Sequence, residues 1–198
     1  MRICFLSCSH ILTQTRFLLL CLCLAVSGNL YATGHDYKIV ISTSKQQLSV
    51  VDDNDSVIKK YHVAVGKGGN GNKRKIGDNK TPLGIYKIVD FKEDSKFFLF
   101  MQLDYPNLLD AWYGYKNNII DASDFRKITV AYKSNQIPPQ NTKLGGYIGI
   151  HGIGVENDEK LMIHNGFNWT NGCIALTNEE ISELRKMVKI GTRVIIKE

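Results

Sequence analysis

The chain has 198 residues, of which 43% are hydrophobic and 22% are charged, and its formal net charge is +6. A chain of this length is expected to form one domain with a substantial core, and the sequence contains no internal repeat and no long low-complexity tract. Because the positive charge is modest and no basic stripe with interleaved aromatic residues is present, the composition does not indicate nucleic-acid binding.

Residues 1–32 have the pattern of a secretory signal peptide. Arg2 and Arg16 form a positive amino-terminal region, residues 17–26 are an apolar run, and Ala32 is one of the small residues that permit cleavage. An uncleaved membrane anchor is the alternative, but this run has about ten residues and a spanning helix needs roughly 20. We therefore expect an exported protein with no stable membrane insertion after cleavage.

The first half of the remaining chain alternates apolar and polar residues with a period of two, which predicts β-strands. Residues 52–56 have turn composition and separate two of these strands, so we expect the domain to begin with a β-meander. The apolar positions that define the predicted strands are Tyr37, Ile39 and Ile41; Leu48 and Val50; Tyr61, Val63 and Val65; Ile85, Val89 and Phe91; and residues 97–103.

Two short helices are predicted to follow the strands, because the apolar period changes there. Pro106 suits the first turn of a helix. The predicted apolar stripes are Leu108, Leu109, Trp112 and Tyr113 in the first helix, and Phe125, Ile128 and Tyr132 in the second.

Strand alternation returns at residues 147–152, where His151 points away from the apolar face. Near the end of the chain, Thr177 and Glu180 form a capping box for a helix over about residues 178–189. Gly191 is a suitable helix stop, and a last strand is predicted over residues 192–197.

Cys173 is the one cysteine outside the predicted leader, since Cys4, Cys8, Cys21 and Cys23 all lie within residues 1–32. A single thiol in an exported chain has no intramolecular disulfide partner, so it is either buried packing or a reactive group. A nucleophilic cysteine needs a neighbouring base, because a free thiol is mostly protonated at neutral pH.

His151 and His164 are the candidate bases, and we expect one of them to make the Cys173 thiol anionic. The backbone N–H groups of Gly172 and Cys173 can form an oxyanion hole, because a glycine leaves the backbone open. A zinc site made of the two histidines and Cys173 is a weaker alternative, since their spacing matches no metal signature and a fourth ligand is unassigned.

Gly66, Gly68 and Gly71 match the G-x-G-x-x-G pattern of dinucleotide-binding loops. No helical stripe follows them, so we predict no cofactor here. We interpret residues 66–84 as a mobile basic loop, which is either a solvated connection or a lip over the site.

Four separated motifs resemble those of the YkuD-type L,D-transpeptidases of bacterial cell walls, and the resemblance covers residues 37–198. The motifs are residues 77–86 (Gly-Asp-Asn-Lys-Thr-Pro-Leu-Gly-Ile-Tyr), 105–107 (Tyr-Pro-Asn), 150–152 (Ile-His-Gly) and 170–174 (Thr-Asn-Gly-Cys-Ile). The resemblance implies a mainly β, sandwich-like catalytic domain with short interrupting helices and a C-terminal helix and strand. It also implies a periplasmic or other extracytoplasmic location.

The resemblance implies that Cys173 is the nucleophile and that His151 is the general base. It also implies that the backbone of Gly172 and Cys173 stabilises the oxyanion. The implied partner is a peptidoglycan stem tetrapeptide, whose third residue is acylated onto the cysteine with release of the terminal D-alanine. The acyl group then passes to an amine, which is either a second stem or the lysine of a lipoprotein.

The residues expected to contact this substrate are Trp169, Thr170, Asn171, Gly152 and Lys80. Many relatives have a histidine where this chain has Asn171, and an arginine or asparagine where it has Ala175. Without a cation at position 175, a substrate carboxylate lacks its usual partner. Lys80, Arg74 or Lys75 could supply the positive charge instead.

Three functions therefore compete. The acyl-enzyme is transferred to an amine in a transpeptidase, or it is hydrolysed in an L,D-carboxypeptidase or amidase. The third possibility is a wall-binding module without catalysis, in which Cys173 is only packing.

Overall fold

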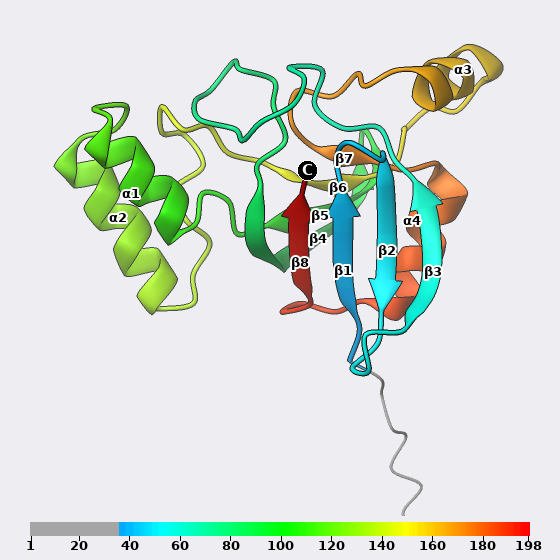
Figure 1. The fold of residues 1–198 in the computed structure, drawn as a ribbon, viewed down its shortest axis with the longest axis horizontal. Helices are drawn as coiled ribbons and strands as arrows, with labels where there is room; N and C mark the ends of the chain where they lie inside the picture. The colour runs from blue at the N-terminus through cyan, green and yellow to red at the C-terminus, as the bar shows by residue number, and fades with distance from the viewer. Residues whose placement is uncertain (1–35) are drawn as a thin grey trace, which may run out of the picture. The chain divides into compact units, whose positions relative to one another are not determined.

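The computed structural model describes residues 36–198. These residues form eight strands and four helices (Figure 1). The predicted signal peptide, residues 1–32, lies outside the described residues. Within residues 36–198, no helix has the length and apolar character needed to cross a membrane.

The first three strands form the antiparallel meander that the sequence predicted. Strand β1 (Lys38–Ser42) pairs with β2 (Gln47–Val51), and β2 pairs with β3 (Val57–His62). Ile39 and Ile41 of β1 are fully buried while their neighbours in the strand are partly exposed. The period-two alternation is therefore confirmed in this part of the sheet.

Strand β4 (Gly84–Ser95) is the longest strand and belongs to both halves of the sheet. Its first residues pair with β8 (Arg193–Lys197), and its later residues pair with β5 (Phe98–Leu103). The full strand order is β3-β2-β1-β8-β4-β5-β6-β7. This mixed sheet agrees with the predicted fold class, and β4 connects the meander to the half that carries the histidine and the cysteine.

The predicted apolar face of β4 was wrong. Ile85 is 51% exposed, whereas Tyr86 and Ile88 are buried in the core. Apolar residues occur on both faces of this strand, and the pairing register with β5 shifts between Ile88 and Asp90. Alternation alone therefore does not identify the core-facing side.

Helices α1 (Leu108–Lys116) and α2 (Ala122–Lys133) pack against each other beside the sheet (Figure 1). Both helices were predicted, but the stripe predicted for α1 was wrong, since Leu109 and Trp112 are largely exposed. The buried side of α1 consists of small or polar residues, among them Gly114. A Cβ at Gly114 would lie 2.7 Å from the side chain of Leu144, so the close packing of this helix requires a glycine.

Helix α3 (Asp158–Gly166) was not predicted, because it has no regular apolar stripe. Helix α4 (Asn178–Met187) was predicted, and the Thr177–Glu180 capping box at its start is confirmed. Helix α4 buries Ile181 completely in the main core beneath the sheet.

Candidate active site

Cys173 and His151 line the same cleft, which has a volume of about 590 Å³. Three of the residues expected to contact substrate also line it, namely Trp169, Thr170 and Asn171. Gly152 and Lys80 are not among the lining residues. The full lining is Lys67, Lys92, Ser95, Lys96, Phe97, Phe100, Tyr147, His151, Trp169, Thr170, Asn171 and Cys173.

The sheet register explains why two residues 22 positions apart in the sequence share a cleft. Strand β6 (Gly149–His151) runs parallel to β7 (Ile174–Ala175), and Ile150 is paired with Ile174. Both isoleucines are buried in the core. Because side chains alternate along a strand, His151 and Cys173 project from the opposite face, toward the cleft.

Gly149 continues the register opposite Cys173, and it must be a glycine. A Cβ on Gly149 would lie 2.5 Å from the carbonyl oxygen of Met101 and 2.6 Å from the ring of Phe100. The close approach of β5 and β6 at this point therefore requires a residue without a side chain, and it leaves room beside the cysteine.

His151 is only 2% exposed, and its Nδ1 lies 2.7 Å from the carbonyl oxygen of Gly152. A carbonyl oxygen can only accept, so Nδ1 carries a proton and donates it to this bond. In the neutral ring, Nε2 is then unprotonated and can accept a proton. Gly152 thus fixes the tautomer of His151 instead of lining the cleft.

The His151 ring is held by three aromatic side chains. Phe97 stacks on it with a centroid distance of 4.2 Å and an interplanar angle of 25°. Phe100 lies nearly parallel at 6.3 Å, and Trp169 meets the ring edge-on at 5.8 Å. These contacts and the Gly152 hydrogen bond fix the ring orientation, and Trp169 lines the cleft beside His151.

Burial lowers the pKa of His151 to about 4, although its hydrogen bond to Gly152 opposes this shift. Electrostatic repulsion of the imidazolium form by His164 and Lys96 lowers it further. The imidazole is therefore neutral at pH 7.

Cys173 is partly exposed, and its thiol donates a hydrogen bond to the carbonyl oxygen of Tyr147 at 3.4 Å. Burial of the sulfur raises the pKa of Cys173 to about 11, while the Gly149 N–H and the charge of Lys73 oppose this shift. The expectation of an anionic sulfur was therefore wrong for the resting protein. Desolvation outweighs the nearby positive groups, and the thiol and imidazole are both neutral.

The turn before Cys173 is fixed by Thr170. The Thr170 hydroxyl donates to the carbonyl oxygen of Cys173 at 2.7 Å, and it accepts from the N–H of Gly172 at 3.1 Å. Gly172 has φ +131°, and a Cβ there would lie 2.7 Å from the carbonyl oxygen of Lys80. Both the backbone conformation and the lack of space therefore require glycine directly before the cysteine.

The loop over residues 66–84 supports this turn. Asp78 accepts a hydrogen bond from the Lys73 side chain at 2.8 Å and from the backbone N–H groups of Arg74, Lys75 and Lys80. The charged and backbone donors lower the pKa of Asp78 against the effect of its burial, so the carboxylate remains ionised.

Lys80 extends along this loop and does not reach the cleft. Its Nζ donates to the carbonyl oxygen of Asn70 at 2.6 Å. Arg74 is also engaged elsewhere, since its guanidinium lies 3.8 Å from the ring of Tyr113. The cations that do line the cleft are Lys67, Lys92 and Lys96, which the sequence pattern did not single out.

His164 does not line the cleft. It lies in α3, is 1% exposed, and makes an edge-on ring contact with His62 at 5.9 Å. Neither ring nitrogen has a hydrogen-bond partner among the described residues. Over residues 36–198, no group of three or more His, Cys, Asp or Glu side chains is arranged to hold a metal.

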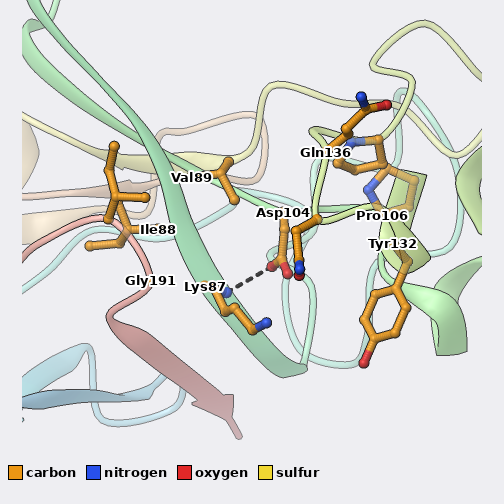
Figure 2. Close-up of a pocket in the computed structure, with 11 residues that line it drawn as sticks. Lys87, Ile88, Val89, Asp104, Pro106, Tyr132, Gln136 and Gly191 are labelled. Atoms are coloured by element: carbon orange, nitrogen blue, oxygen red, sulfur yellow. Dashed lines mark hydrogen bonds between the residues drawn. The ribbon is translucent and has the colours of Figure 1, made fainter. Parts of the chain in front are cut away.

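A second, smaller hollow of about 200 Å³ lies between β4 and the end of α2 (Figure 2). Figure 2 shows Asp104 beside Lys87, whose N–H donates to the Asp104 carboxylate at 2.7 Å, with Tyr132 on the opposite side. The residues that line this hollow include no cysteine and no histidine. Cys173 and His151 thus line the cleft described above and not this hollow.

The chain belongs to the family of L,D-transpeptidase catalytic domains, because the YkuD family model matches residues 36–196. This confirms the resemblance drawn from the four motifs. No curated protein matches the chain.

Solved structures with the same fold include the helical cell shape determining protein Pgp2 from Campylobacter jejuni, at 20% identity and a TM-score of 0.53. The match covers 83% of this chain and 49% of Pgp2. Bd1075 from Bdellovibrio bacteriovorus is 22% identical with a TM-score of 0.50, over 82% of this chain and 48% of that protein. The chain thus spans about half the length of these relatives.

Proposed function

We propose that the protein is an exported L,D-transpeptidase that acts on peptidoglycan stem tetrapeptides through a Cys173 acyl-enzyme. The observation that carries this proposal is the projection of Cys173 and His151 into one cleft from adjacent, register-fixed strands. Family membership supports the reaction class. The predicted signal peptide and the nature of the substrate support a periplasmic or other extracytoplasmic location.

In the first step, His151 Nε2 takes the proton of Cys173 Sγ while the sulfur attacks the carbonyl carbon of the third stem residue. Because the pKa values of about 4 and about 11 disfavour a separated ion pair, proton transfer accompanies formation of the S–C bond. The negative charge moves to the carbonyl oxygen of the tetrahedral intermediate.

The oxyanion is stabilised by backbone N–H groups at the turn. The Cys173 N–H is the principal donor in this proposal, because the Gly172 N–H already donates to Thr170. Imidazolium at His151 is a strong acid in its buried position, so it protonates the leaving amine. The C–N bond breaks, D-alanine departs, and a thioester remains on Cys173.

In the second step, an amine attacks the thioester and His151 accepts the proton that the amine loses. The new amide forms and the proton returns to sulfur, which restores the neutral thiol. The acceptor is the side-chain amine of a second stem or the lysine of a lipoprotein. Water in place of the amine gives hydrolysis, so both reactions use the same residues until the thioester has formed.

Incubation of the mature protein with purified tetrapeptide muropeptides, followed by mass spectrometry, tests this function. Crosslinked dimers are expected from the wild type and none from Cys173→Ala, with circular dichroism to establish that the variant is folded. Formation of tripeptides without dimers would mean that the protein is a carboxypeptidase and not a transferase. No Cys173-dependent product would overturn the enzymatic proposal in favour of a wall-binding module.

A further inference from the structure

We propose that Lys67, Lys92 and Lys96 bind the free carboxylates of the donor stem peptide, so that the enzyme selects unamidated stems. This inference rests on the proposed function and names the substrate chemistry that the cleft recognises. The three lysines, instead of Lys80, Arg74 or Lys75, then supply the positive charge that position 175 lacks in this chain.

The charge of the cleft is entirely positive. Its lining contains Lys67, Lys92 and Lys96 and no aspartate or glutamate. All three side chains are exposed, and within residues 36–198 none of them forms an ion pair. Each ammonium group is therefore available to a ligand, and a carboxylate is its ordinary partner.

Two of the lysines lie on the histidine side of the cleft. In the sheet, Lys92 of β4 is paired with Phe100 of β5, and Phe100 is paired with His151 of β6. Lys96 Nζ lies 4.9 Å from the ring of Phe97, which stacks on His151.

Lys92 also lies near Tyr147, a residue that contacts the cysteine. Its Nζ lies 5.9 Å from the ring of Tyr147, and the Tyr147 carbonyl accepts the hydrogen bond of the Cys173 thiol. Lys92 and Lys96 therefore line the cleft on the same side as the His151 ring.

Lys67 approaches from the other wall of the cleft. Its backbone N–H donates to the carbonyl oxygen of Thr170 at 2.9 Å, next to Asn171 and the cysteine turn. Lys67 therefore lines the cleft from the segment beside the cysteine turn, whereas Lys92 and Lys96 line it from β4 and the turn that follows this strand.

The two-sided arrangement matches a free-acid tetrapeptide, which carries carboxylates on both sides of its reacting bond. The terminal D-alanine carboxylate lies on the leaving-group side. On the acyl side, a diamino acid at the third position carries a side-chain carboxylate, which some cell walls convert to an amide. Amidation removes the charge that an ammonium group recognises, and it leaves the scissile bond unchanged.

The lysines hold the substrate in the ground state as well as in the transition state, so their loss should raise KM more than it lowers kcat. For cations in an open cleft, each Lys→Met substitution should raise KM by a factor on the order of 3 to 5. The effect should weaken at high salt, because exposed charges are screened.

The test compares two donor tetrapeptides that differ only in amidation of the side-chain carboxylate at the third residue. The wild type should prefer the free acid by a factor on the order of 10 in kcat/KM. His151 protonates the leaving amine, so Lys92 and Lys96 bind the D-alanine carboxylate and Lys67 binds the side-chain carboxylate of the third residue. Lys67→Met should therefore lose this preference while keeping most of kcat. The double variant Lys92→Met with Lys96→Met should raise KM for both donors.

Lys133→Met is the matched control, because Lys133 is an exposed lysine of α2 that does not line the cleft. It should keep the wild-type preference and KM. Equal turnover of both donors by the wild type, or a preference that survives in Lys67→Met, would overturn the inference and leave the proposed function standing. If the wild type turns over neither donor, the proposed function fails as well.

Discussion

The protonation state of Cys173 gives the sharpest prediction, because two models of the site give opposite results. A preformed thiolate–imidazolium pair would alkylate quickly at pH 6, whereas a thiol with a pKa of about 11 and an imidazole with a pKa of about 4 are both neutral at this pH. With a pKa of about 11, the thiolate fraction at pH 7 is on the order of 10⁻⁴, compared with roughly 3% for a free cysteine.

This difference in thiolate fraction is about 300-fold, and it is partly offset by reactivity. A thiolate of higher pKa is the better nucleophile, and a Brønsted slope of 0.4 to 0.5 raises its rate constant roughly 10-fold. Cys173 should therefore react with iodoacetamide roughly 20-fold more slowly than free cysteine at pH 7. Its rate should continue to rise with pH toward 11.

The assay measures alkylation of the mature protein by intact mass between pH 5 and pH 10, with Cys173→Ala as the blank. A rate that is already constant below pH 8 would refute the neutral pair and restore the ion pair. Free cysteine measured in parallel controls for the pH dependence of the reagent.

Three further predictions concern the base and the turn. His151→Ala should lower kcat by a factor on the order of 10² or more in the muropeptide assay, because the variant lacks the proposed general base. The pKa of His151 falls from its ordinary 6.5 to about 4 on folding, so its contribution to stability is present above pH 6.5 and is lost as the pH falls through 4. Urea unfolding should show up to about 3 kcal/mol of this loss, and His151→Phe should show less. Gly172→Ala should cost about 1–3 kcal/mol in the same unfolding assay and abolish most activity, since it strains the backbone and collides with the Lys80 carbonyl. Unchanged turnover in Gly172→Ala would mean that catalysis does not require a glycine at position 172.

Local sequence features predicted much of the scaffold. The alternation in β1 and β2 and the Thr177–Glu180 capping box depend on neighbouring residues only, and all three are confirmed. Helix α3 was missed because it lacks an apolar stripe, although Asn157 followed by two acidic residues was an available N-terminal signal.

From the sequence alone, the candidate groups of the site could be identified as a cysteine that follows a glycine in a polar turn and a histidine on a strand flanked by glycines. Tertiary structure decided how those groups behave. Parallel pairing of β6 and β7 puts Cys173 and His151 on one face, and burial lowers the pKa of His151 and raises that of Cys173. Desolvation depends on atoms contributed by distant segments, so no local pattern reveals it. The lysines of the cleft were overlooked for the same reason, because Lys67 and Lys96 become neighbours of the cysteine only when the sheet is complete.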